Sequence, residues 1–272
     1  MAVLSIDLAE RRWSDLGIVI LDHKRPTFRP RLGPSDLPVF LSEQGAPAPV
    51  RCEILPWHEP GRVDARTLAG RINHLCGVRN IRMILLDGPQ AWKSSSNGLQ
   101  FARVSERQLN TASKTGLPGM VKPGTHRHFA EFCLDVYDEF CRRGWRRLET
   151  SGQPSSGPER VLVESYPRAA WKSLGLQPLP SKRRARISDL AEAYAALNQL
   201  IPFTVNRPPN HDQLQAIVGG LPGLALEARD SAGARIVGTP PRREDGHWRE
   251  GFIVLPVAPV HVLGMRWLQC SK

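Results

Sequence analysis

Three apolar segments of the sequence each end at, or next to, an acidic residue. These acids are Asp7, Asp87 and Glu164. A carboxylate at the end of a buried strand is costly unless a cation, a hydrogen bond or water compensates its charge. Each acid alone would be interpreted as part of a turn at a strand end. Three such coincidences favour one common site.

The spacing of apolar residues predicts an ordered series of strands and helices. Strands are expected at 3–6, 16–21, 50–55, 81–86, 160–163 and 251–256. Helices are expected from the N-cap Asp64 to Gly77, at 129–144, at 188–201, and over a last segment that Pro222 stops. This order predicts an α/β fold with a mixed sheet, in which the first three strands are antiparallel and helical crossovers lead to later ones.

We expect one domain over residues 1–272, with a core at about 1–222 and a C-terminal extension, 223–272, that packs on it. Pro26–Pro49 and Trp92–Thr125 are predicted loop insertions. The second is rich in Ser, Asn, Gly, Pro and Lys. It is long for an idle loop, so we interpret it as a candidate functional lid.

The chain is strongly basic: 37 Lys and Arg against 26 Asp and Glu give a net charge of +11. Such a surface attracts polyanions, and nucleic acid is the leading partner class. Two clusters are candidate phosphate contacts, although both could also be solvated surface: Arg142, Arg143, Trp145, Arg146 and Arg147, and Lys182, Arg183, Arg184 and Arg186. Trp145 could stack on a base.

Other classes of protein are disfavoured by what the sequence lacks. No apolar run reaches about 18 residues, so we expect no membrane association. Five scattered cysteines without a Cys-x-x-Cys pair indicate a reducing, cytoplasmic setting without structural zinc. There is also no Gly-x-Gly-x-x-Gly or P-loop motif, which argues against dinucleotide enzymes and P-loop ATPases.

The three carboxylates would meet at one edge of the sheet if their strands are neighbours. They would then repel one another unless a metal ion is bound. Oxygen ligands without His or Cys favour Mg²⁺ or Mn²⁺ over zinc. A pair of such ions, about 4 Å apart, can activate water and stabilise the leaving oxygen in phosphodiester hydrolysis.

Six segments occur in an order that resembles the domain of unknown function 429 family. They begin at Met1, Leu85, Arg103, Val163, His211 and Glu250, and read MAVLSIDLA, LLDGPQ, RVSERQL, VESYPRAA, HDQLQA and EGFIVLP. The resemblance implies a ribonuclease-H-like fold and a predicted nuclease activity. It places Asp7, Asp87 and Glu164 at three acids of the family's motifs.

The fourth motif departs from the family's usual His-Asp-x-Leu-Asp-Ala. His211 and Asp212 are present, but Gln215 replaces the second acid. On a helical wheel, Asp212 lies nearly opposite the apolar stripe and Gln215 flanks it, so position 215 is expected to face the site. Asp212 is then either a further catalytic acid or the cap of its helix.

Two functions remain open. The first is a nuclease that uses Mg²⁺ or Mn²⁺ to hydrolyse phosphodiester bonds in DNA or RNA, with Asp7 and Glu164 as shared metal ligands, Asp87 assisting, and Asp212 as a further acid. The second is a catalytically impaired nucleic-acid-binding or interaction protein that keeps the fold. Gln215 motivates the second, because an amide brings no charge to a metal ion.

Overall fold

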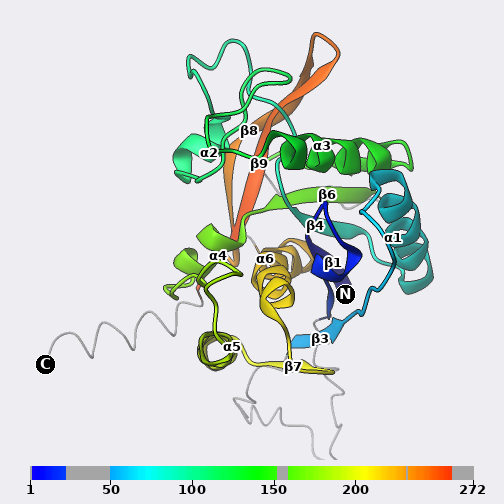
Figure 1. The fold of residues 1–272 in the computed structure, drawn as a ribbon, viewed down its shortest axis with the longest axis vertical. Coiled ribbons are helices and arrows are strands. Elements are labelled where there is room, and N and C mark those ends of the chain that lie inside the picture. The colour runs from blue at the N-terminus through cyan, green and yellow to red at the C-terminus, as the bar shows by residue number, and fades with distance from the viewer. Residues whose placement is uncertain (1, 23–49, 152–158, 231, 259–272) are drawn as a thin grey trace, which may run out of the picture.

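A computed structural model of the chain describes residues 2–22, 50–151, 159–230 and 232–258. The predicted insertion Pro26–Pro49 lies outside these residues. Within them, one mixed sheet runs through the molecule in the order β7-β3-β2-β1-β4-β6-β9-β8, and β5 pairs with β6 (Figure 1). The strands are β1 (Ala2–Asp7), β2 (Gly17–Asp22), β3 (Val50–Ile54), β4 (Met83–Asp87), β5 (Trp145–Arg147), β6 (Arg160–Ser165), β7 (Phe203–Val205), β8 (Ala234–Glu244) and β9 (His247–Pro256).

The directions of the central strands match the sequence prediction. Strands β1, β2 and β3 are antiparallel neighbours, whereas β4, β6 and β9 continue the sheet parallel to β1. The predicted α/β architecture, a mixed sheet flanked by helices, is confirmed.

Helices cover both faces of this sheet (Figure 1). Helices α1 (Ala65–Arg79) and α3 (Arg127–Cys141) bury Leu68, Ile72 and Phe140 on one face. Helices α4 (Pro167–Ser173), α5 (Ile187–Leu200) and α6 (His211–Ala228) cover the other. The short helix α2 (Val104–Gln108) packs beside β8 and β9, and η1 (Trp13–Asp15) is a single 3-10 turn.

The sequence analysis expected residues after 222 to form an extension that packs on the core, but the described part of this segment belongs to the sheet itself. Strand β9 pairs with β6 inside the sheet, and β8 pairs with β9 at its edge. Helix α6 also continues through Pro222 to Ala228. A proline costs about 3 kcal/mol inside a helix, but the buried Leu221, Leu224 and Leu226 on either side of it hold the helix on the sheet.

The first helix likewise passes its predicted stop at Gly77. It ends instead at Asn80, which adopts the left-handed conformation with φ 51°. Asparagine is one of the residues that tolerate this conformation at a helix end. Glycine in the last turn therefore weakens α1 without terminating it.

Helix α6 approaches the sheet more closely than side chains would normally allow. A Cβ atom on Gly220 would lie 2.6 Å from Leu21 Cδ1 and 2.8 Å from Ser5 Cβ, and one on Gly223 would lie 2.4 Å from Leu85 Cδ1. At the start of the helix, a Cβ on Gly17 would lie 2.1 Å from the carbonyl oxygen of Asp212. Glycines on α6 and on β2 therefore determine how closely α6 packs against the sheet.

We predict that Gly220→Ala lowers the free energy of unfolding by about 1–3 kcal/mol, as overpacking in a core does. The matched control is Gly77→Ala, because a Cβ there meets nothing within 4 Å. That control should stabilise α1 by about 0.5–1 kcal/mol. Denaturant unfolding measures both, and equal effects of the two substitutions would contradict the close packing of α6.

Candidate functional site

Asp7 and Asp87 lie opposite each other at the ends of β1 and β4. They are direct partners in the parallel register, and Asp87 is in turn the partner of Ser165 on β6. Because side chains alternate along a strand, these three residues share the face that α6 covers. The sequence prediction that Asp7 and Asp87 meet at one sheet edge is what the structure shows.

The pKa values of both carboxyl groups are raised, which favours protonation of the pair. Burial, followed by the negative charges of Asp87 and Asp212, raises the pKa of Asp7 well above its usual value. Burial also raises the pKa of Asp87 to about 7, with a contribution from the charge of Glu164, although a hydrogen bond from Asp7 opposes this shift. Such a pair is poorly compensated as two anions and would gain from a cation.

Asp212 comes to this site from the first turn of α6. Gly17, the strand partner of Asp7, contacts the backbone of Asp212 and thereby brings the start of α6 beside β1. The Asp212 carboxylate accepts from Lys182 Nζ at 2.5 Å and lies 3.2 Å from His211 Nδ1. The N-cap of α6 is Asn210, whose side chain accepts from Gln213 N. Asp212 is therefore not the cap.

Gln215 does not face the carboxylates, contrary to the expectation from the helical wheel. Its Oε1 accepts a hydrogen bond from Trp171 Nε1 at 2.8 Å, which directs the side chain towards α4. The helical wheel predicted that residues at the flank of the apolar stripe of α6 face the site. In the structure, however, α6 is buried nearly all round, so the stripe does not identify the side that meets the strand ends. Asp212 occupies the position that was expected for residue 215.

Glu164 is held apart from the aspartates by an ion pair with Arg103. Arg103 Nη1 and Nη2 donate to its two carboxylate oxygens at 2.7 and 2.5 Å, and Gln90 N donates to Oε2 at 3.0 Å. Glu164 is the register partner of Leu86, not of Asp87, so it points to the opposite face of the sheet. Burial nevertheless raises the pKa of Glu164.

Arg103 is itself anchored by a second carboxylate. Its Nε and Nη2 donate to Glu106 Oε1 at 3.2 and 3.1 Å, and Glu106 also accepts from the backbone and hydroxyl of Thr115. Both charged residues are buried. Although burial lowers the pKa of Arg103, the two carboxylates raise it above the usual value, so the guanidinium stays charged.

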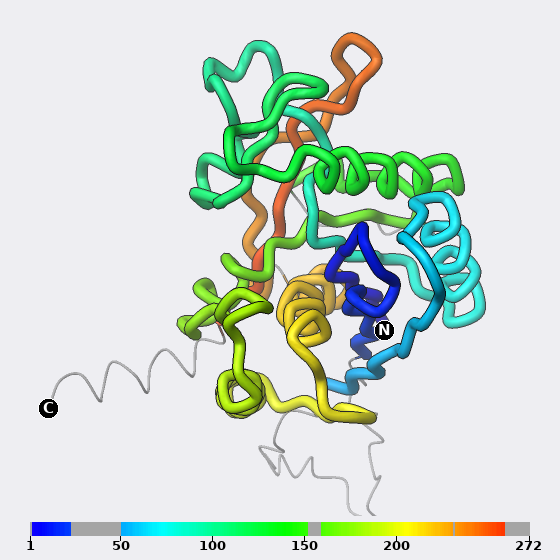
Figure 2. The backbone as a smooth tube through the Cα atoms, viewed as in Figure 1, coloured from blue at the N-terminus to red at the C-terminus, as the bar shows by residue number. Residues whose placement is uncertain are grey.

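The segment 92–125, interpreted from the sequence as a candidate lid, supplies this network. It contains α2 and lies beside the β8–β9 hairpin (Figure 2), where Trp92 forms a bridge with Arg249. The roles of Arg103 and Glu106 were missed. Their i, i+3 spacing in a polar segment, inside one of the family-like motifs, was the available signal.

The carboxyl groups of Asp7 and Asp87 are candidate oxygen ligands for a divalent cation. No group of three or more His, Cys, Asp or Glu side chains that could hold a metal ion occurs within the described ranges. Burial and nearby negative charges, however, raise the pKa values of Asp7 and Asp87, and a cation in place of a proton would relieve their repulsion. Carboxylate oxygens are the ligands that Mg²⁺ and Mn²⁺ prefer.

The first basic cluster is mostly structural. Trp145 is buried, where it donates from Nε1 to Asn73 and contacts Phe140 edge-on, so it is not free to stack on a base. Arg147 is also buried and pairs with Asp138 at 2.7 Å. The remaining arginines of the cluster form ion pairs, Arg142 and Arg143 with Glu139, and Arg146 with Glu159.

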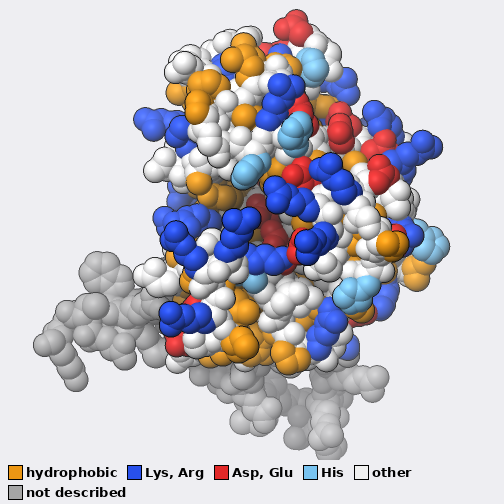
Figure 3. All heavy atoms as spheres, in the orientation of Figure 1, with side chains coloured by type: hydrophobic (Ala, Val, Ile, Leu, Met, Phe, Trp, Pro, Cys, Tyr) orange, Lys and Arg blue, Asp and Glu red, His pale blue; other side chains and the backbone are white. Residues whose placement is uncertain are grey.

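The second basic cluster lies next to the acids. Lys182 bridges Asp15 and Asp212, and although burial lowers its pKa, these hydrogen bonds raise it above the usual value. Arg183, Arg184 and Arg186 are exposed. On the face of the molecule drawn in Figure 3, acidic side chains lie in a hollow, and Lys and Arg side chains surround it.

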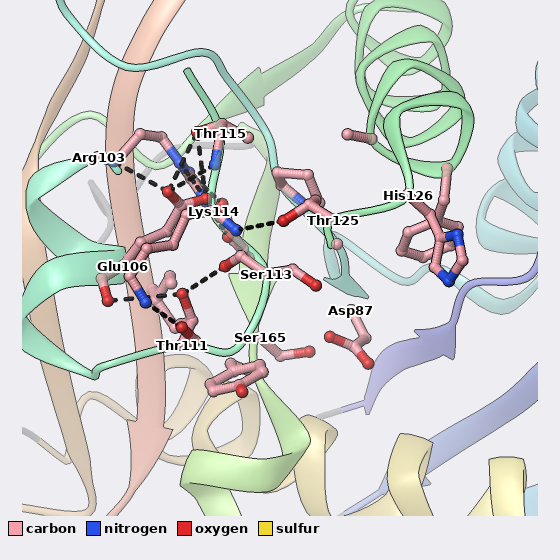
Figure 4. Close-up of a pocket in the computed structure, with 17 residues that line it drawn as sticks. Asp87, Arg103, Glu106, Thr111, Ser113, Lys114, Thr115, Thr125, His126 and Ser165 are labelled. Carbon is pink, nitrogen blue, oxygen red and sulfur yellow. Dashed lines mark hydrogen bonds and ion pairs between the residues drawn. The ribbon is translucent and has the colours of Figure 1, made fainter. Parts of the chain in front are cut away.

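A cavity of about 220 Å³ opens beside Asp87, beyond the carboxyl ends of β4 and β6. Thr111, Ser113 and Thr125 lie on one side of it, and Asp87 and His126 on another (Figure 4). Such positions at the ends of parallel strands are where ligands bind in open α/β sheets.

Comparison with known proteins gives distant matches. No model of a known protein family matches the sequence, and no curated protein does, so the family resemblance stays a prediction. Among solved structures, the chain is similar to Thermus thermophilus RuvC at 11% identity and TM-score 0.36, over 84% of this chain and 96% of that one. The structure of T. thermophilus RuvC in complex with Holliday junction substrate matches at 11% identity and TM-score 0.35, over 85% of this chain and 96% of that one. Separately, the described helices include none long and apolar enough to cross a membrane.

We predict that Arg103→Met lowers the free energy of unfolding by about 3–5 kcal/mol at pH 8, because Glu164 and Glu106 lose their buried counter-ion. Without Arg103 the folded-state pKa of Glu164 rises further above its unfolded value. The penalty should therefore shrink as the pH falls towards 5 and the carboxyl binds a proton in the folded state. Denaturant unfolding at both pH values tests this. The double variant Arg103→Met/Glu164→Gln is the control and should recover part of the loss at pH 8, whereas a pH-independent penalty would contradict the charge argument.

Proposed function

We propose that the protein is a metal-dependent hydrolase of phosphodiester bonds in nucleic acid. The observation that carries this proposal is the pair of Asp7 and Asp87, two carboxyls with raised pKa values at neighbouring strand ends, with Asp212 close enough to raise the pKa of Asp7. The carboxylates of Asp7 and Asp87 are oxygen ligands of the kind that Mg²⁺ and Mn²⁺ prefer.

Each acid has a separate task in this proposal. Asp7 and Asp87 would hold the cation, which when bound would activate water and stabilise the leaving oxygen. Asp212 would act next to them, oriented by Lys182 and His211. Glu164 would not act as the shared ligand that the sequence predicted, because Arg103 already neutralises its charge. It would instead stabilise the end of β6, and its charge would contribute to the raised pKa of Asp87.

Basic side chains next to these acids support a polyanionic substrate. Lys182 contacts Asp212 directly, and Lys114 lines the cavity beside Asp87. Burial, then the charges of Lys122 and other cations, lowers the pKa of Lys114, as expected where cations gather. Phosphate contacts of this kind occur with both DNA and RNA, so both belong among the test substrates.

A second candidate function is nucleic-acid binding without efficient cleavage. Gln215 does not support this function, because its side chain faces α4. The supporting observation is the ion pair between Arg103 and Glu164. One candidate ligand fewer would weaken the hold on a second ion. Binding through Lys and Arg would then fall steeply with salt concentration while no strand is cut.

We predict that Asp7→Asn lowers Mn²⁺-dependent cleavage by about 100-fold or more, since even residues that only orient metal ligands cost 10–100-fold. Labelled single- and double-stranded DNA and RNA serve as substrates. Asp245→Asn, at an exposed turn between β8 and β9, is the matched control and should cut like the wild type. Gln215→Asp should change cleavage little. Equal activity of Asp7→Asn would sink the assignment, and salt-dependent binding without cleavage by the wild type would favour the second candidate.

We also predict that Mn²⁺ binds about tenfold more tightly at pH 8 than at pH 6, because a proton with a pKa of about 7 must leave Asp87 first. Calorimetry in two buffers of different ionisation enthalpy would detect the released proton. Asp87→Asn should bind more weakly, and part of the pH dependence should remain because burial also raises the pKa of Asp7. An affinity that does not change between pH 6 and pH 8 would refute the coupling.

A further inference from the structure

We propose that the cavity beside Asp87 receives one unpaired nucleobase of the strand that the acids act on. The inference rests on the proposed function, because it assumes a nucleic-acid substrate. It goes further in naming a substrate class: a single strand, or a strand with a base turned out of its stack. Base pairing would keep the base out of such a cavity.

The size of the cavity suits a single small planar group. Its volume of about 220 Å³ is below the roughly 300–1,000 Å³ of pockets that hold drug-sized ligands. It lies between the first turn of α3, the strand ends of β4 and β6, and the segment 111–115. A base in it would place its own phosphate near the rim, where Asp87 is part of the lining.

The walls supply both surfaces that a base needs. Phe129 and Tyr166 contribute aromatic rings, and both are partly buried. Tyr166 is the N-cap residue of α4 and lies near the Ala112 backbone. Aromatic side chains are common platforms for unpaired bases because every base has a π-face.

Polar groups in the wall could bind the edge of a base. Ser165 Oγ is buried and has no hydrogen-bond partner among the described residues. In Figure 4 it points towards Asp87. That oxygen is almost without exposed surface and faces Gly219 of α6, so the polar groups that a base could reach are the exposed Ser113 hydroxyl and Lys114. Lys114, at the same wall, is placed to contact the adjoining phosphate.

The charged residues at the back of the cavity do not oppose a neutral base. Arg103 lies between Glu164 and Glu106 and pairs with both. The fixed charges there are therefore largely compensated. A small anion would meet these carboxylates and Asp87, whereas an uncharged ring would not be repelled.

The test compares two single strands with the same number of phosphates: one made entirely of abasic deoxyribose units, and one with a single central thymine. Binding is measured by fluorescence anisotropy in EDTA, so that no cleavage is required. The single base lets the strand shift until the base finds its site. For the wild type we expect the thymine to tighten binding by about 5-fold to 150-fold, the range of one base–aromatic contact.

Ser113→Trp, which fills the cavity from an exposed lining position, should abolish this gain while leaving affinity for the abasic strand unchanged. Ala112→Trp is the matched control, since its neighbouring side chain is exposed and does not line the cavity. If Ser113→Trp fails to fold, Phe129→Leu removes one ring and should reduce the gain.

The proposal is overturned if thymine adds no affinity to the wild type, or if Ser113→Trp or Phe129→Leu keeps the full gain. Failure of the proposed hydrolysis gives a different result. In that case the thymine gain would be present in EDTA, but no Mn²⁺-dependent cleavage would appear on any substrate.

Discussion

Helix α6 lies so close to β1, β2 and β4 that glycine is needed on both sides of the contact. Gly220 and Gly223 leave room for Leu21, Ser5 and Leu85, and Gly17 leaves room for the backbone at Asp212. This contact determines where the first turn of the helix lies relative to the strand ends. The position of Asp212 relative to Asp7 is thus determined mainly by the packing of α6 in the hydrophobic core.

The charges around this site are balanced in two different ways. Arg103 neutralises Glu164 and Glu106, and Lys182 neutralises Asp212 and Asp15, through direct contacts. For Asp7 and Asp87, burial and the charges of neighbouring carboxylates raise the pKa values instead and so favour protonation. A proton is exchangeable in a way that an arginine is not. The aspartate pair is therefore the place where solution conditions can change the charge of the site.

Much of the fold could be predicted from the sequence because it depends on local patterns. Apolar runs predicted the central strands. The positions of Asp7 and Asp87 at the ends of two of these runs predicted that the two acids lie close together. The pattern could not show which side of α6 meets the sheet, because the helix is buried nearly all round and its glycines carry no hydrophobic signal. Nor could it show that Glu164 turns away. That depends on register, since a shift of one residue moves a side chain to the other face.

The ion pair between Arg103 and Glu164 gives the strand end a counter-ion that belongs to the chain itself. Its local concentration does not depend on the ions in solution, and it does not dissociate when they are removed. The wall built on Glu106 and Thr115 would accordingly keep its shape in the presence of a chelator. The shape of the cavity would in this way be independent of whether the proposed cation is bound at the aspartate pair.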